Sequence, residues 1–137
     1  MATSPRLSQR RWYNPRLPQT LVISQWLLYF NAFWAALGIL SVGLNPNLQL
    51  TALGRIFSFG ALATSLYGAY GIANEKKIGY RVAVVSAFLP FVVAIVSGGS
   101  IVDILLPGGI LNAIFVWALV ALLLHTQSRE HQRIWFS

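Results

Sequence analysis

Long apolar runs alternate with short polar segments along the chain. The apolar runs cover residues 20–44, 56–73, 78–96 and 110–125. A helix of about 20 apolar residues crosses the hydrocarbon core of a bilayer. The fourth run is short, because its fifteen clearest residues, 110–124, would span about 22 Å at about 1.5 Å per residue. Flanking residues or local thinning of the bilayer must therefore help it to span. The pattern predicts an all-α, polytopic membrane protein with four transmembrane helices in an up-down bundle.

The connection between the third and fourth runs is unusual. Two Gly-Gly pairs bracket residues 101–106, which are apolar except for Asp103. This piece is either a short interfacial helix or the first half of a broken fourth helix, interrupted at Pro107-Gly108-Gly109. Pro90 lies in the middle of the third run, where it lacks an N–H and is expected to kink the helix.

The basic residues predict the orientation in the membrane. Residues 1–19 and 126–137 are polar tails, and residues 74–81 (NEKKIGYR) form a short basic loop. Every cation except Arg55 falls in these three segments. Lys and Arg in short loops and near segment ends stay on the cytoplasmic side. We therefore expect both termini in the cytoplasm of a multi-pass protein of the cell membrane.

Composition supports the membrane class. Hydrophobic residues make up 56% of the 137 residues and charged residues 9%, with a mean hydropathy of +0.63. A soluble chain of this length could not hide so much apolar surface. The net charge of +7 comes from cations that flank apolar runs, so anionic lipid headgroups, and not nucleic acid, are the expected partner. No cysteine is present, which excludes disulfides and thiolate chemistry.

Small residues recur every four positions in the second run. Helices in lipid associate through close backbone approach at such rows. We therefore expect this helix to lie at the centre of the bundle. The packing residues are Gly60, Ala61, Thr64, Ser65, Gly68 and Ala69.

Four polar residues suggest specific contacts. Gln25 and Asn31 lie in the first run and are expected to bond to another helix, because an unpaired polar group is costly in lipid. Arg55 and Asp103 are the only opposite charges expected outside, and we predict an exposed ion pair between them, worth about 0–1 kcal/mol.

The chain ends in an apolar cluster, Ile134, Trp135 and Phe136, which follows a polar segment. Such a cluster is not expected to remain in water. We predict that it bends back to the interface, folds against the N-terminal tail, or docks on a partner protein.

Catalytic groups are sparse. Glu75, Asp103 and Glu130 lie in separate segments and form no paired acid–base site. His125 and His131 are six residues apart and lack a metal co-ligand. No glycine-rich phosphate loop is present in the sequence. We expect no enzyme activity, no metal and no cofactor, although His125 remains a remote candidate for ligating a pigment or haem.

Two segments carry a family resemblance. They are residues 67–77 (YGAYGIANEKK) and residues 127–135 (QSREHQRIW). The chain resembles small uncharacterised four-helix integral membrane proteins of actinobacteria. The resemblance implies a bacterial plasma membrane and implies no activity.

Three functions remain open from the sequence. The first is a non-enzymatic accessory or scaffold subunit of a larger membrane complex, or a small homo-oligomer. The second is a small transporter or channel whose path is lined by the Pro107-Gly108-Gly109 break, Pro90, Gln25 and Asn31. The third, which is remote, is pigment or quinone binding by the aromatic first helix and His125.

Overall fold

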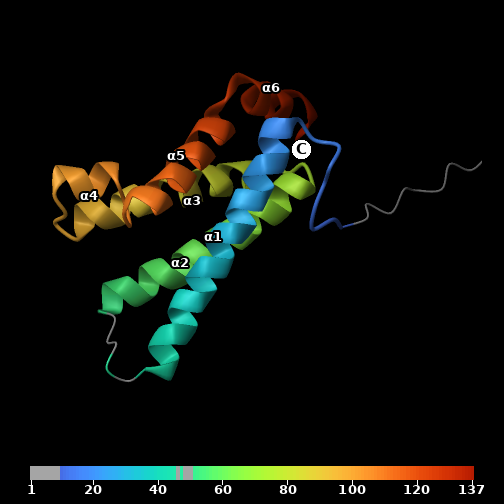
Figure 1. Cartoon of the computed structure of the whole chain (residues 1–137). Coiled ribbons are helices and arrows are strands. Elements are labelled where there is room, and N and C mark those ends of the chain that lie inside the picture. Colours follow the sequence, from blue (N-terminus) through green and yellow to red (C-terminus); the bar gives the residue numbers. More distant parts are fainter. Residues whose placement is uncertain (1–9, 46, 48–50) are drawn as a thin grey trace, which may run out of the picture.

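The computed structural model describes residues 10–45, 47 and 51–137, and over these ranges the regular structure is helical with no strand. Figure 1 shows the arrangement of the helices. They are α1 (Gln19–Leu44), α2 (Ala52–Ala73), α3 (Lys77–Val96), α4 (Ile101–Leu105), α5 (Ile110–Leu124) and α6 (Thr126–Trp135). The predicted all-α class is confirmed.

Three helices, α1, α2 and α3, are each long and apolar enough to cross a membrane. Helix α5 has 15 residues and reaches that length only together with α6, from which it is bent by 49°. The described chain therefore has three candidate spans, or four if the bent pair is one span. A membrane protein is supported, while the fourth span and the side of the membrane on which the termini lie stay predictions.

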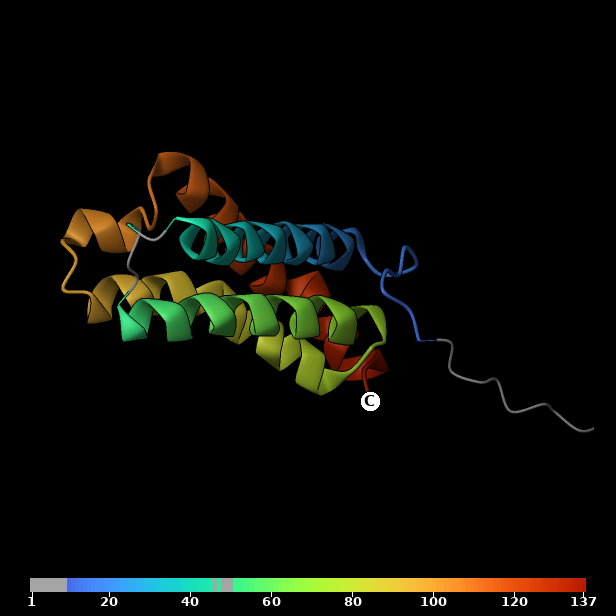
Figure 2. The same cartoon turned by 90° about the horizontal axis from the view of Figure 1, so that it is seen from below.

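The long helices pack in chain order. Helix α2 lies antiparallel to α1 and to α3, and α5 packs against both α1 and α3 (Figures 1 and 2). The short helix α4 lies beside the last part of α3, at the opposite end of the bundle from α6. This order places the four predicted segments in one bundle.

Segments that are far apart in the sequence meet at one end of the bundle, which we call the basic end. Arg11 donates its backbone N–H to Oδ1 of Asn74 at 2.9 Å. The C-terminal Ser137 accepts a backbone hydrogen bond from Lys77 at 3.0 Å. Residues 10–18, which we call the N-terminal segment, thus share this end with the α2–α3 connection and α6. We call the opposite end, which carries α4, the last turn of α1 and the first turn of α2, the distal end.

Local signals explain two helix starts. Helix α2 begins four residues before the predicted run, because the Thr51 side chain accepts a hydrogen bond from the backbone of Gly54 and caps the helix. In α4, Ser100 and Asp103 form a reciprocal capping box, in which each side chain accepts a bond from the other residue's backbone N–H.

The predicted break between residues 101–106 and the fourth run is present. Gly108 and Gly109 have φ values of +72° and +93°, a region that favours glycine, and they separate α4 from α5. Trp117 then donates its indole N–H to the Leu105 carbonyl at 2.8 Å and ties α4 to α5. Residues 101–105 are therefore a separate short helix.

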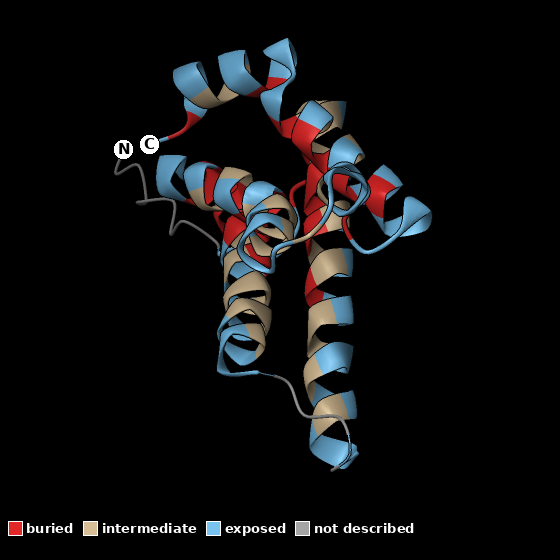
Figure 3. Ribbon diagram, turned by 90° about the vertical axis from the view of Figure 1, so that its left-hand side faces the viewer, coloured by how far each residue is buried: buried red, intermediate tan, exposed pale blue. Residues whose placement is uncertain are grey.

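The core lies toward the basic end. Leu21, Leu28, Ile72, Ala83 and Leu123 are fully buried there. Figure 3 shows that burial decreases along α1 and α2 toward the distal end. The distal half of the bundle is consequently the more open half.

Candidate solute cavity

Helices α2 and α3 approach each other closely at two glycine positions of α2. A Cβ added to Gly68 would lie 2.8 Å from Cα of Ala83, and a Cβ on Gly71 would collide with the backbone of Gly79. Of the predicted packing residues, Ser65, Gly68 and Ala69 are buried here, and Ala61 and Thr64 are half-buried. A Cβ on Gly60 would meet no atom within 4 Å. The small-residue rows therefore hold the helices together in the half nearer the basic end.

A hydrogen-bonded chain of three side chains crosses the bundle just beyond this contact. Asn31 of α1 donates its amide N–H to Oγ of Ser65 in α2 at 2.8 Å. The Ser65 hydroxyl lies 2.8 Å from the hydroxyl of Ser86 in α3. Asn31 thus finds the partner on another helix that the sequence predicts. Each bond of this kind is worth about 0.6 kcal/mol in a membrane protein.

A cavity of about 700 Å³ lies on the distal side of this chain. Its size falls within the range of about 300–1,000 Å³ that is typical of small-molecule sites. Every helix except α6 contributes to the wall or borders it. The residues on which its chemistry depends are Asn31, Trp34, Ser86, Pro90, Asp103, Pro107 and Asn112.

The wall offers hydrogen-bond acceptors. The Asn112 amide donates to the Pro107 carbonyl at 2.8 Å, and the Asn31 amide donates to Ser65, so the carbonyl oxygen of each side chain is left as an acceptor. Pro90 has no N–H to donate to the Ser86 carbonyl, which loses its usual helical partner. The side-chain carbonyls of Asn31 and Asn112 are therefore the acceptors that line the cavity, while Ser86 lies in its wall with only 1% of its surface exposed.

One carboxylate stands on the cavity wall at the distal end. Asp103 accepts hydrogen bonds from the hydroxyl of Ser100 at 2.7 Å and from its backbone N–H at 2.8 Å. These two bonds stabilise the anion and lower the pKa of Asp103 below its ordinary value, although slight desolvation opposes the change. Asp103 is therefore negatively charged at neutral pH.

The predicted ion pair between Arg55 and Asp103 does not form. Both residues lie in the described part of the chain, and no ion pair is present there. The Asp103 carboxylate instead accepts its hydrogen bonds from Ser100, three residues earlier in the chain. Arg55 lies exposed in the first turn of α2, where its backbone N–H donates to the Thr51 carbonyl.

Gln25 does not line the cavity, and its partner is not another long helix. Its amide oxygen accepts from the Asn14 N–H at 3.1 Å, and its amide N–H groups donate to the carbonyls of Asn14 and Leu21. Asn14 also donates to the Ala73 carbonyl at 3.2 Å. The N-terminal segment thus folds over the basic end and provides the bonds that the sequence assigned to a helix.

The C-terminal cluster divides into two parts. Phe136 is 3% exposed and packs against Tyr80 and His131, so it is not available to a partner protein. Ile134 and Trp135 are 65% and 66% exposed. The predicted docking role is therefore restricted to these two residues, because Phe136 completes the protein's own core.

His125 stands at the bend between α5 and α6. It is exposed, and its Nδ1 accepts a bond from the Gln127 N–H as the cap of α6. The cap turns the chain, so residues 126–135 do not continue the fourth helix in a straight line. Among the described residues, no group of three or more His, Asp or Glu side chains could hold a metal ion.

Two residues at these contacts, Asn112 and Asn14, were missed from the sequence. Asn112 is the only polar side chain apart from Trp117 in residues 110–124, which could have marked it. Ser86, in contrast, follows from the sequence, because it lies four residues before Pro90, the position whose carbonyl a proline frees. Asn14 lies in a proline-containing tail, and no local pattern indicates its contact with α1.

Comparison with family models, curated proteins and solved structures finds no match for this chain. The resemblance to small actinobacterial membrane proteins accordingly stays a prediction.

Proposed function

We propose that the protein is a non-enzymatic membrane protein that binds a small hydrogen-bond-donating solute in the cavity, as a small transporter or solute-binding subunit. The observation that carries this proposal is the meeting of Asn31, Pro90 and the Pro107-Gly108-Gly109 turn at one cavity of about 700 Å³. Gln25, which the sequence places on the same path, lies outside it.

The chemistry of the wall favours small organic amines. The side-chain carbonyls of Asn31 and Asn112 can accept hydrogen bonds from a solute. The Asp103 carboxylate favours a cation over an anion, and the Trp34 ring at the wall adds an aromatic face that attracts ammonium groups. The remaining wall is mostly apolar and suits a short alkyl chain.

The core closes the cavity on the side of the basic end. Leu28, Ile72 and Leu119 are buried there, and the N-terminal segment covers the end of α1. A solute that enters from the distal end would bind in the cavity but could not pass the closed core to reach the basic end. Transport would require the basic half to open.

Calorimetric titration of the protein in lipid nanodiscs tests the binding. Butylammonium is expected to bind more tightly than butyrate. Asn112→Leu should weaken butylammonium binding about tenfold, since it removes one acceptor for the ammonium group and the hydrogen bond that positions it against the Pro107 carbonyl. Asn45→Leu, at the exposed end of α1, is the matched control and should bind like the wild type. Equal binding of butyrate and butylammonium, or no binding of either, would reject the proposal.

Uptake of butylammonium into liposomes that contain the protein then distinguishes a transporter from a solute-binding subunit. Uptake that Asn112→Leu abolishes identifies a transporter. Binding without uptake identifies a solute-binding subunit.

A second candidate, an accessory or scaffold subunit, is favoured by the exposed Ile134 and Trp135 on α6. Native mass spectrometry of the protein from mild detergent tests it. A co-purifying subunit that Trp135→Ala removes would support this role, and an unaccompanied monomer in both proteins would reject it.

A further inference from the structure

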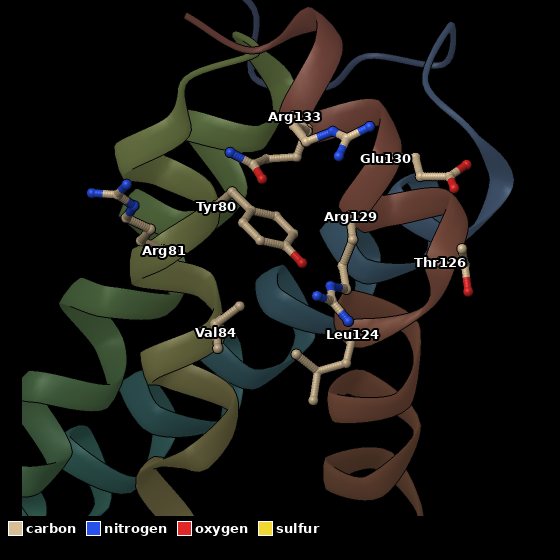
Figure 4. A pocket seen from close by; sticks show the side chains of 9 residues that line it. Tyr80, Arg81, Val84, Leu124, Thr126, Arg129, Glu130 and Arg133 are labelled. Carbon is tan, nitrogen blue, oxygen red and sulfur yellow. The ribbon is translucent and has the colours of Figure 1, made fainter.

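A second hollow, which we call the arginine groove, lies between α3 and the α5–α6 bend at the basic end (Figure 4). Its volume is about 730 Å³. The residues that determine its character are Tyr80, Arg81, Val84, Leu124, Arg129 and Arg133. The groove shares no lining residue with the solute cavity.

Three cations surround the groove without an internal counterion. In the ranges that the structure describes, no carboxylate forms an ion pair with Arg81, Arg129 or Arg133. Figure 4 shows the Arg129 side chain extending into the gap beside Tyr80. The side chains of Arg81 and Glu130 also border the groove, but both point away from the gap, on opposite sides. The groove therefore has a net positive charge.

Charge and apolar surface are ordered along the groove. Val84 and Leu124 lie toward the middle of the bundle, and Arg133 lies toward the basic end (Figure 4). A phospholipid has the same order, with an anionic headgroup outside and acyl chains toward the bilayer centre. A soluble anion such as phosphate has no apolar part that could pack against Val84 and Leu124.

Both walls of the groove are held in place. The Tyr80 hydroxyl donates to the Leu123 carbonyl and joins α3 to α5. On α6, the Ser128 hydroxyl lies 2.8 Å from the Thr20 hydroxyl and 2.6 Å from the Leu122 carbonyl oxygen. The bend that opens the groove is thus anchored to α1 and to α5, and the site is preformed.

We propose that the arginine groove binds the phosphate headgroup of an anionic phospholipid, with Arg129 as the central contact and Arg133 at the rim. Arginine suits this contact because its planar guanidinium donates two parallel hydrogen bonds to phosphate oxygens. The lipid's acyl chains would lie along Val84 and Leu124. The inference is independent of the solute proposed for the cavity.

Lipid retention tests the site. The full chain is reconstituted in nanodiscs of phosphatidylcholine with a minor fraction of phosphatidylglycerol, extracted, and analysed by native mass spectrometry for bound lipid. The apparent affinity for phosphatidylglycerol should fall about fivefold in Arg129→Gln, the effect of one cation near an anionic membrane surface, and further in the Arg129→Gln/Arg133→Gln double variant.

Arg16→Gln is the matched control, because Arg16 is an exposed cation of the N-terminal segment outside the groove. It should retain phosphatidylglycerol like the wild type. Equal losses in Arg16→Gln and Arg129→Gln would show a diffuse charge effect and overturn the proposal. Thermal unfolding in pure phosphatidylcholine shows whether Arg129→Gln still folds, and Arg133→Gln provides a second test of the groove if it does not.

Competition with inorganic phosphate distinguishes a site for a phospholipid headgroup from a site for a soluble anion. Phosphate added in excess over the lipid should leave phosphatidylglycerol bound, because it cannot use the apolar wall. Complete displacement by phosphate would identify a site for a soluble anion and reject the lipid.

Discussion

The last residue of the chain, Ser137, is hydrogen-bonded to the α2–α3 connection, where its backbone N–H donates to the Glu75 carbonyl at 3.0 Å. Its own carbonyl accepts from Lys77 at 3.0 Å, so two backbone bonds fasten the C-terminus. Glu75 has a φ of +56°, an uncommon value for a residue other than glycine, and the connection turns there to meet the chain end. The C-terminal segment is therefore part of the folded core.

Phe136 should contribute strongly to stability. Phe136→Ala removes a side chain that is 3% exposed and packs on Tyr80, so it should lower the free energy of unfolding by about 3 kcal/mol. The measurement is reversible unfolding by SDS in mixed micelles. Trp135→Ala, at the exposed neighbouring position, should change it by less than about 0.5 kcal/mol. Equal effects of the two substitutions would contradict a buried C-terminal anchor.

The contact between Gly71 and Gly79 should tolerate no side chain. Gly71→Ala places a methyl group against the Gly79 backbone and should destabilise the protein by about 1–3 kcal/mol. Gly60→Ala, on the same helix but in open space, should be neutral or stabilise by up to about 1 kcal/mol through helix propensity. The same unfolding assay compares them. A smaller loss for Gly71→Ala than for Gly60→Ala would refute this packing.

The cap of α4 should depend on pH. Because its bonds to Ser100 lower the pKa of Asp103, the folded state prefers the anion and binds fewer protons than the unfolded state. The contribution of the cap is therefore present above the unfolded carboxyl pKa, about 3.9, and is lost as the pH falls through the lower folded value. Amide hydrogen exchange in α4 should be faster in Asp103→Asn than in the wild type at pH 7.

Amide hydrogen exchange of the wild type and Asp103→Asn at acidic pH provides the control. Once Asp103 is protonated, the wild type and Asp103→Asn should exchange α4 amides at similar relative rates. Amides of α2, whose cap is Thr51, should show no difference between the two proteins at either pH. An unchanged α4 in Asp103→Asn at pH 7 would contradict the role of the capping box.

Much of the helical architecture follows from local sequence. Runs of apolar residues with Asn45 or Gly108-Gly109 at their ends predict α1 and α5, because a helix in an apolar environment satisfies its own backbone and turn residues end it. The Asn31 partner on another helix also follows, since lipid offers no alternative bond. The start of α2 differs because the Thr51 cap extends the helix beyond its apolar run.

The candidate sites depend on relationships that a linear pattern does not contain. Asn31, Pro90 and Asn112 line one cavity only because α1, α3 and α5 pack together, and Gln25 leaves the predicted path because Asn14 folds back onto it. Arg81 and Arg129 border one groove because α6 bends at His125.

Composition and periodicity by themselves determined that this chain forms apolar helices with its cations concentrated at one end, because each helix satisfies its own backbone and keeps its charges near water. Tertiary packing decided which polar groups meet. Hydrogen bonds such as those of Ser137 and Asn14 join residues across more than fifty positions, and no local preference determines which of many possible partners a side chain finds.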